Sequence, residues 1–414
     1  MAGPLAGVRI LDLTTVIMGP FATQILGDLG ADVVKIEAPG GDVMRHVGPY
    51  RHPGMGPLFL QCNRNKRSVV LDLKRPADRQ ALLDLVPQAD VLVYNIRPQA
   101  MRRLGLDYET LAAINPGLIF CGAFGFGEAG PYAGRPAYDD ILQAASGVAS
   151  LLQRVHGTPS YVPINFCDRT VGLYLANTLL AALFHKQRTG EGQAIELPMF
   201  ETMVQFTMGD HLGGAAFVPP EGATGYRRLL STQRGPYPTR DGYLCVVVYT
   251  DEHWRRFSAM IGVPDLVAHD ARFASLQART LHAEEIGAFL AGQLAGRATQ
   301  EWIEQFAHAD IPASPVNSLE DLLDDPHLRA VGFWEEIEHP TEGRLRVTAP
   351  PGRWSRTPPA VRCLAPNLGA DSATPWSAPG ALPSDRAIDA CALPDAGHAL
   401  GPCDAAATRR DDHL

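Results

Sequence analysis

The strongest constraint on the fold is an alternation of short apolar runs with helical patterns over the first 125 residues. The apolar runs are rich in Val, Ile and Leu, and they occupy residues 8–13, 32–37, 68–73, 90–95 and 118–122. Between them, residues 21–30 carry apolar side chains at helical spacing, and a second helix is predicted across about 76–87. β-branched runs that alternate with helices indicate a parallel sheet covered on both faces. We therefore predict an open, Rossmann-like α/β domain.

The character of the chain changes near residue 225. A turn signal at Asp241-Gly242 precedes a predicted strand, and amphipathic helical patterns follow as far as residue 309. The last part of the chain is rich in Ala, Pro, Asp, Gly and Ser and has no periodicity, which is typical of disorder. We assign the large domain to residues 1–224 and a smaller α/β domain to residues 225–330. Residues 331–368 are predicted to return to the large domain, and residues 369–414 to form a disordered tail.

Composition excludes several classes of function. The chain has 414 residues, 46% of them hydrophobic, and a net charge of −9, which argues against nucleic-acid binding. No apolar run is long enough for a membrane span, and the N-terminus lacks the pattern of a secretory signal. The seven cysteines are scattered without CxxC spacing, so neither a disulfide framework nor a zinc site is indicated. We expect a cytoplasmic protein without a metal, a nucleic-acid partner or a membrane partner.

Asp168 is the most informative single residue. It stands directly before a long apolar helix predicted over 171–184, which ends at Gly190 after cationic residues. An Asp at this place can be a helix N-cap, because its carboxylate accepts hydrogen bonds from free backbone N–H groups. The same carboxylate can be a nucleophile. The two interpretations are compatible, and we expect the helix terminus to keep the carboxylate ionised.

Ligands of open α/β sheets bind at the carboxyl ends of the strands. Cations gather there in this sequence, and they either bind a phosphorylated ligand or are ordinary solvated charges. These cations are Arg64, Lys66, Arg67, Arg97, Arg102 and Arg103. Residues 125–130 spell G-x-G-x-x-G after a predicted strand, but Pro131, Gly134 and Pro136 follow and prevent a helix from starting there. We therefore reject a dinucleotide site at this loop.

Taken together, several segments resemble the class III CoA-transferases, the family of formyl-CoA transferase and carnitine CoA-transferase. The resemblance extends over about residues 4–365 and rests on motifs at residues 4–12, 29–37, 63–68, 95–98, 138–147, 188–193 and 325–328. It implies a homodimer in which each chain threads through a ring formed by the other. It also implies that coenzyme A and acyl-CoA are substrates and that no cofactor is tightly bound.

The resemblance implies that the Asp168 carboxylate is the nucleophile and forms an anhydride and then an aspartyl-CoA thioester. CoA contacts are implied at Val16, Leu71, Asn95, Arg103, Leu104, Arg135 and Tyr138. Ile17 and His211 are candidate substrate contacts, with a structural role as the alternative for His211.

Two other functions remain as alternatives. An α-methylacyl-CoA racemase of the same fold needs a pair of acid/base groups, and its His before the Asp is replaced here by Tyr138. The other alternative is a CoA-binding protein without activity. Residues 231–236 lack the glycine run of formyl-CoA transferases, which argues against formate and oxalate. We expect a succinyl-CoA-type donor and a small dicarboxylic acid as acceptor.

Overall fold

The computed structural model describes residues 3–376, and its centre is a parallel six-stranded sheet. The strand order is β3-β2-β1-β4-β5-β6, the order of doubly wound nucleotide-binding folds. This confirms the predicted open α/β sheet. The strands are β1 (Arg9–Leu13), β2 (Asp32–Glu37), β3 (Lys66–Val70), β4 (Val91–Tyr94), β5 (Ile119–Phe124) and β6 (Gln193–Pro198). The edge strand β6 was not predicted from the sequence.

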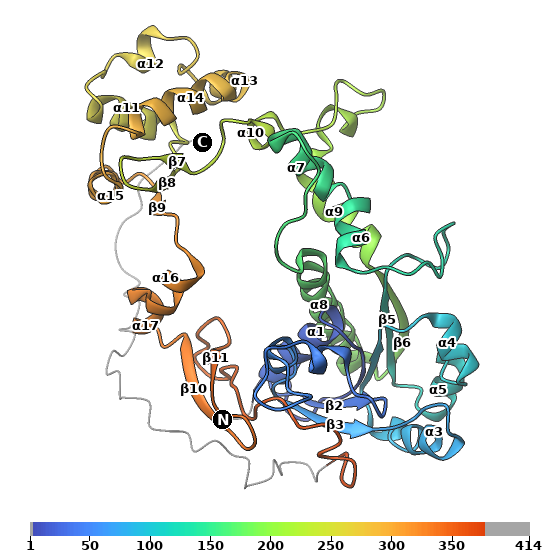
Figure 1. Ribbon diagram of the computed structural model, residues 1–414. Coiled ribbons are helices and arrows are strands. Elements are labelled where there is room, and N and C mark those ends of the chain that lie inside the picture. Colours follow the sequence, from blue (N-terminus) through green and yellow to red (C-terminus); the bar gives the residue numbers. More distant parts are fainter. Residues whose placement is uncertain (1–2, 377–414) are drawn as a thin grey trace, which may run out of the picture.

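Helices cover both faces of this sheet (Figure 1). Side chains alternate along β1, so Ile10 packs toward one face and Leu11 toward the other. The face of Ile10 is covered by α1 (Met18–Asp28) and α8 (Phe166–Thr189). The opposite face is covered by α3 (Pro76–Leu83), α4 (Pro98–Arg103) and α5 (Tyr108–Ile114). The apolar runs of the sequence therefore become strands that are buried on both sides.

A second group of helices extends away from the sheet beyond β5 and α8 (Figure 1). It consists of α6 (Asp139–Ala145), α7 (Val148–His156), α9 (Met199–His211) and α10 (Arg227–Leu230). The short helix α10 contacts both α7 and α13 (Leu276–Leu281), so it connects this arm to the next part of the chain. Short helical turns elsewhere are η1 (Val43–His46), α2 (Pro57–Leu60), η2 (Val86–Gln88) and η3 (Gly213–Ala216).

The smaller lobe has its own core, in which Trp254, Phe257 and Trp302 are buried. Its sheet is antiparallel, with β8 (Tyr243–Val246) between β7 (Tyr237–Pro238) and β9 (Ala313–Pro315). The remaining helices of the lobe are α11 (Asp251–Met260), α12 (Leu266–His269), α14 (Ala283–Leu294) and α15 (Thr299–His308). The lobe is therefore built on a short antiparallel sheet and its own apolar core.

The chain then returns to the large sheet and so runs around a central opening (Figure 1). The returning elements are α16 (Leu319–Asp324), α17 (Pro326–Ala330) and the antiparallel hairpin β10 (Trp334–His339) and β11 (Gly343–Thr348). Within residues 3–376, no helix is long and apolar enough to cross a membrane.

The predicted start of the tail at residue 369 is wrong. Gly369 donates its backbone N–H to the Ser68 hydroxyl, and Asp371 accepts from the Ser68 backbone N–H at 2.9 Å. The Ser372 hydroxyl accepts from the Val70 backbone N–H in the same way. Residues 369–372 therefore occupy the free edge of β3, because that edge presents unpaired backbone groups. The rest of the predicted tail, residues 377–414, lies outside the described residues.

Candidate active site

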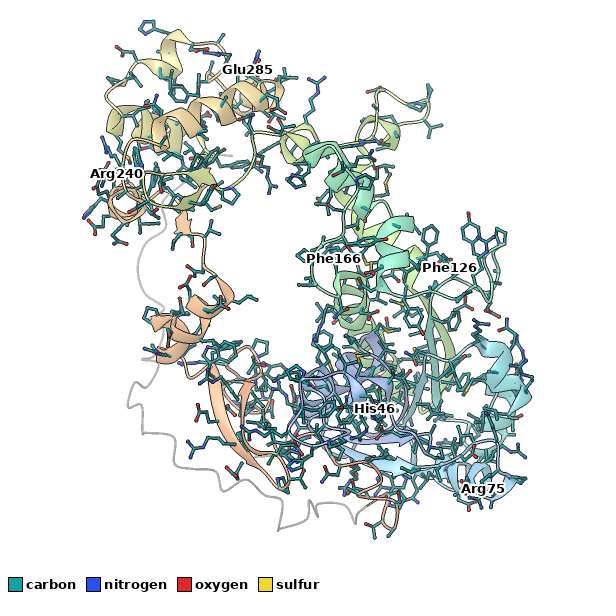
Figure 2. The ribbon with its side chains drawn as sticks, in the orientation of Figure 1. His46, Arg75, Phe126, Phe166, Arg240 and Glu285 are labelled. Atoms are coloured by element: carbon teal, nitrogen blue, oxygen red, sulfur yellow. The ribbon has the colours of Figure 1, made fainter. Side chains whose placement is uncertain are left out.

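Asp168 is the third residue of α8, at the edge of the central opening where Phe166 is labelled in Figure 2. The side chain is buried, with 7% of its surface exposed. The helix begins at Phe166 after Asn165, so Asp168 is not the N-cap, and that interpretation was wrong. Instead, the backbone N–H of Asp168 donates to Oδ1 of Asp139 at 2.9 Å. The carboxylate that caps this helix therefore comes from a different helix, and the carboxylate of Asp168 is left available for chemistry.

Asp139 is the first residue of α6 and is itself buried. Its Oδ2 accepts a hydrogen bond from Nε2 of Gln143 at 2.7 Å, one helical turn along α6. Oε1 of Gln143 in turn accepts from the backbone N–H of Val162 at 2.9 Å. The pair thus fixes the segment that leads into α8 as well as the first turn of α8. Residues 138–147 were recognised as a family motif, but a site role for Asp139 and Gln143 was missed.

The electrostatic environment favours the protonated form of Asp168. Burial raises the pKa of its carboxyl group to about 7, with a further contribution from the negative charge of Asp139, whereas Arg169 acts in the opposite direction. Burial therefore opposes the expected effect of the helix terminus, which would keep Asp168 ionised. Removal from water outweighs the helix dipole, whose effect at one terminus is about 0.3–1 kcal/mol.

The start of α8 lies close to the start of α1. A Cβ atom on Gly172 would lie 2.9 Å from the carbonyl oxygen of Met18, so only glycine allows this approach. Gly172 is one helical turn beyond Asp168, on the same side of α8. The guanidinium of Arg169 stacks over the Phe21 ring at 4.5 Å. The loop that ends at Ile17, the residue before α1, is thereby brought to the same region as Asp168.

A cavity of about 490 Å³ opens at the carboxyl ends of the strands. Three of the predicted CoA contacts, Leu71, Arg103 and Leu104, lie in its wall together with Thr15 and Ala38. Most of the remaining wall is apolar, with Leu13, Ile36, Leu73 and Ile96. The structure therefore brings together residues that the sequence places far apart, at the edge of the sheet where ligands of such folds bind.

Val16 and Asn95 fix the loop that borders this cavity. The Asn95 side chain accepts from the Thr15 backbone N–H at 3.0 Å and donates to the Thr15 carbonyl at 2.8 Å. Val16 has a φ of 72°, a left-handed conformation that is unusual for a β-branched residue. Its backbone N–H donates to Oδ1 of Asp42 at 3.2 Å. Both residues therefore shape the loop through contacts within the chain.

Arg135 and Tyr138 belong to the irregular segment between β5 and α6. The Arg135 guanidinium lies over the Tyr132 ring at 4.2 Å, and Tyr138, directly before Asp139, is 69% exposed. No helix begins within the G-x-G-x-x-G loop of this segment. The backbone N–H groups of Gly127 and Glu128 donate to glutamate side chains of β6 and α9. This loop therefore lacks the helix N-terminus that holds the pyrophosphate in a dinucleotide fingerprint.

His211 is the last residue of α9 and is buried. Its Nδ1 accepts a hydrogen bond from the backbone N–H of Tyr226 at 3.3 Å, so the ring connects α9 to the segment before α10. This contact is structural. A role for His211 or Ile17 toward substrate stays a prediction.

Half of the predicted phosphate-binding cations have a different role. Arg64, Lys66 and Arg67 pair with carboxylates of the large domain, at 2.7, 3.0 and 2.9 Å. The Lys66 ammonium reaches Asp12 in the middle of the sheet, where both side chains are fully buried. Burial lowers the pKa of Lys66 to about 8. These three cations stabilise the core, which leaves Arg103 as the predicted cation in the cavity wall.

Within the described range 3–376, no cluster of three or more His, Cys, Asp or Glu side chains could hold a metal ion.

Comparison with known proteins identifies the family. The chain matches the model of CoA-transferase family III over residues 5–372. It is 32% identical to the succinate–glutarate CoA-transferase of Agrobacterium fabrum, over 88% of this chain and 93% of that protein. It is 31% identical to the succinyl-CoA:mesaconate CoA-transferase of Haloarcula marismortui, over 88% of this chain and 94% of that protein. The crystal structure of Rv3272 from M. tuberculosis matches with a TM-score of 0.78 and 30% identity, over 91% and 99% of the two chains. The chain therefore belongs to CoA-transferase family III and is an enzyme of the EC 2.8.3 type.

Proposed function

We propose that the protein transfers CoA from a succinyl-CoA-type donor to a small dicarboxylic acid, with the Asp168 carboxylate as nucleophile. The observation that carries this proposal is the buried carboxylate at the start of α8, freed from capping by Asp139. The substrate class is supported by relatives that are named for succinate and glutarate, and for succinyl-CoA with mesaconate or L-malate.

The proposed reaction has four steps. The Asp168 carboxylate attacks the donor thioester, which forms a mixed anhydride and releases CoA thiolate. The thiolate attacks the aspartyl carbonyl, which forms an aspartyl-CoA thioester and releases the donor acid. The acceptor carboxylate then attacks this thioester, which forms a second anhydride and again releases the thiolate. Attack of the thiolate on the acceptor carbonyl gives the new acyl-CoA and restores Asp168.

A pKa of about 7 suits Asp168 to this role. A more basic carboxylate is a stronger nucleophile, and near neutral pH a substantial fraction is still ionised. Asp139 contributes to this balance in two ways, since its charge raises the pKa of Asp168 and its hydrogen bond fixes the Asp168 backbone. In this proposal Asp139 is a positioning residue that does not itself react.

The CoA thioester enters as a substrate, and we propose the cavity at the strand ends as the place of its nucleotide part. Its apolar wall offers a surface for a base, and the Arg103 guanidinium can pair with a phosphate. The pantetheine arm would then extend along the loop of Val16 and Ile17 toward the start of α8. Arg135 and Tyr138 would border its far end, and Asn95 would hold the loop in place.

We also propose that two chains form an interlaced homodimer. A single chain runs around a central opening and leaves large apolar side chains exposed on α8. Leu173 and Phe184 are 52% and 60% exposed, and Phe206 on α9 is 47% exposed. Apolar groups on helices next to an opening are typical of a surface that a second chain covers. Light scattering of the purified protein should give twice the mass of one chain, and a monomer would contradict this proposal.

The test of the proposed function is a matrix of acyl-CoA donors and carboxylic acids, with product detection by mass spectrometry. Asp168→Ala should abolish transfer, whereas Asp140→Asn, which changes an exposed acid next to Asp139, should leave it near the wild-type rate. Exchange of the α-proton of a 2-methylacyl-CoA without any CoA transfer would instead identify a racemase. Transfer by Asp168→Ala at the wild-type rate would refute the mechanism.

A further inference from the structure

The smaller lobe contains a second cavity, separate from the sheet edge and from Asp168. It has a volume of about 90 Å³ and lies between α10, the β7–β8 sheet and helices α13 and α14. Among the described residues, three arginines line it, Arg228, Arg234 and Arg279, and no Asp or Glu does. The protein as a whole is acidic, with a net charge of −9, whereas the charged residues that line this cavity are arginines. Such a concentration of positive charge in a confined space favours an anion.

The three arginines differ in how they are held. Arg279 is 6% exposed and donates to Asp251 and to the carbonyl of Phe273 at 2.5 and 2.8 Å, so its position is fixed and its charge is balanced. Arg228 lies over the Tyr249 ring at 5.4 Å. Among residues 3–376, no carboxylate lies within 4.0 Å of the side chain of Arg228 or Arg234. Two guanidinium groups of the cavity therefore have no acidic partner.

The loop that carries Arg234 is held in place on α14. Glu284 accepts from both the backbone N–H and the hydroxyl of Thr232 at 2.9 Å. A Cβ atom on Gly287 would lie 2.7 Å from the carbonyl oxygen of Gln233, so the loop rests directly on the helix. Glu284, in the first turn of α14, binds Thr232 in an adjoining hollow rather than an arginine of the cavity. The backbone of the loop that carries Arg234 is therefore held against α14, and the Arg234 side chain itself is exposed.

Tyr237 adds a neutral donor to the same wall. Burial raises the pKa of its phenol, and Arg228 and Arg234 oppose that rise, so both guanidinium groups lie within electrostatic reach of the hydroxyl. Planar guanidinium forks match the two oxygens of a carboxylate, and a phenol can donate a further hydrogen bond. The small volume suits a carboxylate group rather than a nucleotide.

From these contacts we infer that the cavity binds a small dicarboxylic acid through Arg228, Arg234 and Tyr237. Two guanidinium groups without an acidic partner favour a dianion over a monoanion of similar chain length. The acids of the proposed function have this chemistry, but the inference rests on the cavity and does not require turnover. Within one chain, the elements of the cavity and the start of α8 lie on different sides of the central opening (Figure 2).

The test is calorimetric titration of the full chain with glutarate and, separately, with butyrate, in the absence of any CoA compound. Glutarate should bind wild-type protein at least fivefold more tightly than butyrate. Arg234→Gln should weaken glutarate binding at least tenfold, and Arg234→Lys should weaken it less, because the charge remains. The control is Arg240→Gln, at the outer edge of the lobe in Figure 2, where Arg240 pairs with Glu301 outside the cavity.

Equal affinity of wild-type and Arg234→Gln protein for glutarate, or no binding by the wild type, would overturn the inference. This failure is distinguishable from a failure of the proposed function. Glutarate binding that depends on Arg234, in a protein that transfers no CoA, would contradict only the proposed function. CoA transfer by a protein whose glutarate binding does not depend on Arg234 would contradict only the inferred binding of a dicarboxylic acid in this cavity.

Discussion

Val16 offers a quantitative test of how the loop beside the CoA cavity is held. We predict that Val16→Gly is more stable than Val16→Ala. The reason is the left-handed backbone at this position, with a φ of 72°. This conformation costs a residue with a Cβ atom about 1–2 kcal/mol of free energy, whereas glycine adopts it without that cost.

The surrounding contacts explain why the conformation persists in the native protein. Lys35 Nζ donates to the Thr14 carbonyl at 2.7 Å and pairs with Asp42 Oδ2 at 2.9 Å. Oδ1 of the same Asp42 accepts from the Val16 backbone N–H. Both charged side chains are fully buried. These contacts hold the loop in one conformation, so the backbone strain at Val16 is tolerated.

The magnitude follows from comparing the two substitutions. Both variants lose the Val side chain, and only Ala retains the clash of Cβ. In regular structure with negative φ, Gly is less stable than Ala by about 0.5–1 kcal/mol. At position 16 the sign should invert, with Gly more stable than Ala by about 1 kcal/mol. The assay is urea unfolding followed by circular dichroism, with the free energy of unfolding from the midpoint and slope.

A matched control is available at Val331, which is also partly exposed and has a φ of −89°. There Val331→Gly should be less stable than Val331→Ala. If Val16→Gly were less stable than Val16→Ala by the same margin as at Val331, the argument from backbone strain would be refuted.

Three further predictions concern the proposed site. Because burial raises the pKa of Asp168 from 3.8 to about 7, ionisation of this carboxyl group favours the unfolded chain, so stability is unaffected below pH 3.8 and falls as pH rises from 3.8 to about 7. Asp168→Asn should remove that fall, which amounts to about 4 kcal/mol at pH 8 and to about 2.5 kcal/mol between pH 5 and pH 8, in urea unfolding at those two pH values, and an unchanged pH dependence would contradict the assignment. Asp139→Asn removes a negative charge beside Asp168, so the acidic limb of the pH profile of kcat/KM should move from about 7 to lower pH. An acidic limb at the wild-type pH would exclude an effect of the Asp139 charge on the pKa of Asp168. Arg103→Gln should raise KM for acyl-CoA with little change in kcat, whereas Arg240→Gln in the smaller lobe should change neither. Equal effects of both substitutions would argue against the cavity as the CoA site.

The central strands could be predicted because they are apolar on both faces. The edge strand β6 was missed because its burial alternates and it follows directly on the glycines at 190 and 192. The hairpin of β10 and β11 was missed for a related reason. It carries charged residues such as Glu336 and Arg346, which pair across the strands rather than marking an apolar run.

The site was only partly predictable. Asp168 stands out in the sequence because a carboxylate precedes a long apolar helix. Its capping by Asp139 depends on a contact between residues 29 positions apart, which local pattern does not reveal. The charge of Lys66 was misinterpreted for the same reason, since its partner Asp12 lies 54 positions away on another strand. Burial then sets the pKa values of both Asp168 and Lys66, and burial follows from the tertiary structure.

The most direct test of the account is to identify the bond formed on Asp168. The protein is incubated with succinyl-CoA, quenched with hydroxylamine, digested and analysed by mass spectrometry. We predict a hydroxamate on the peptide that contains Asp168, which requires succinyl-CoA and is absent from Asp168→Asn. Efficient CoA transfer with no modification of Asp168, or with the modification on another carboxylate, would contradict the account.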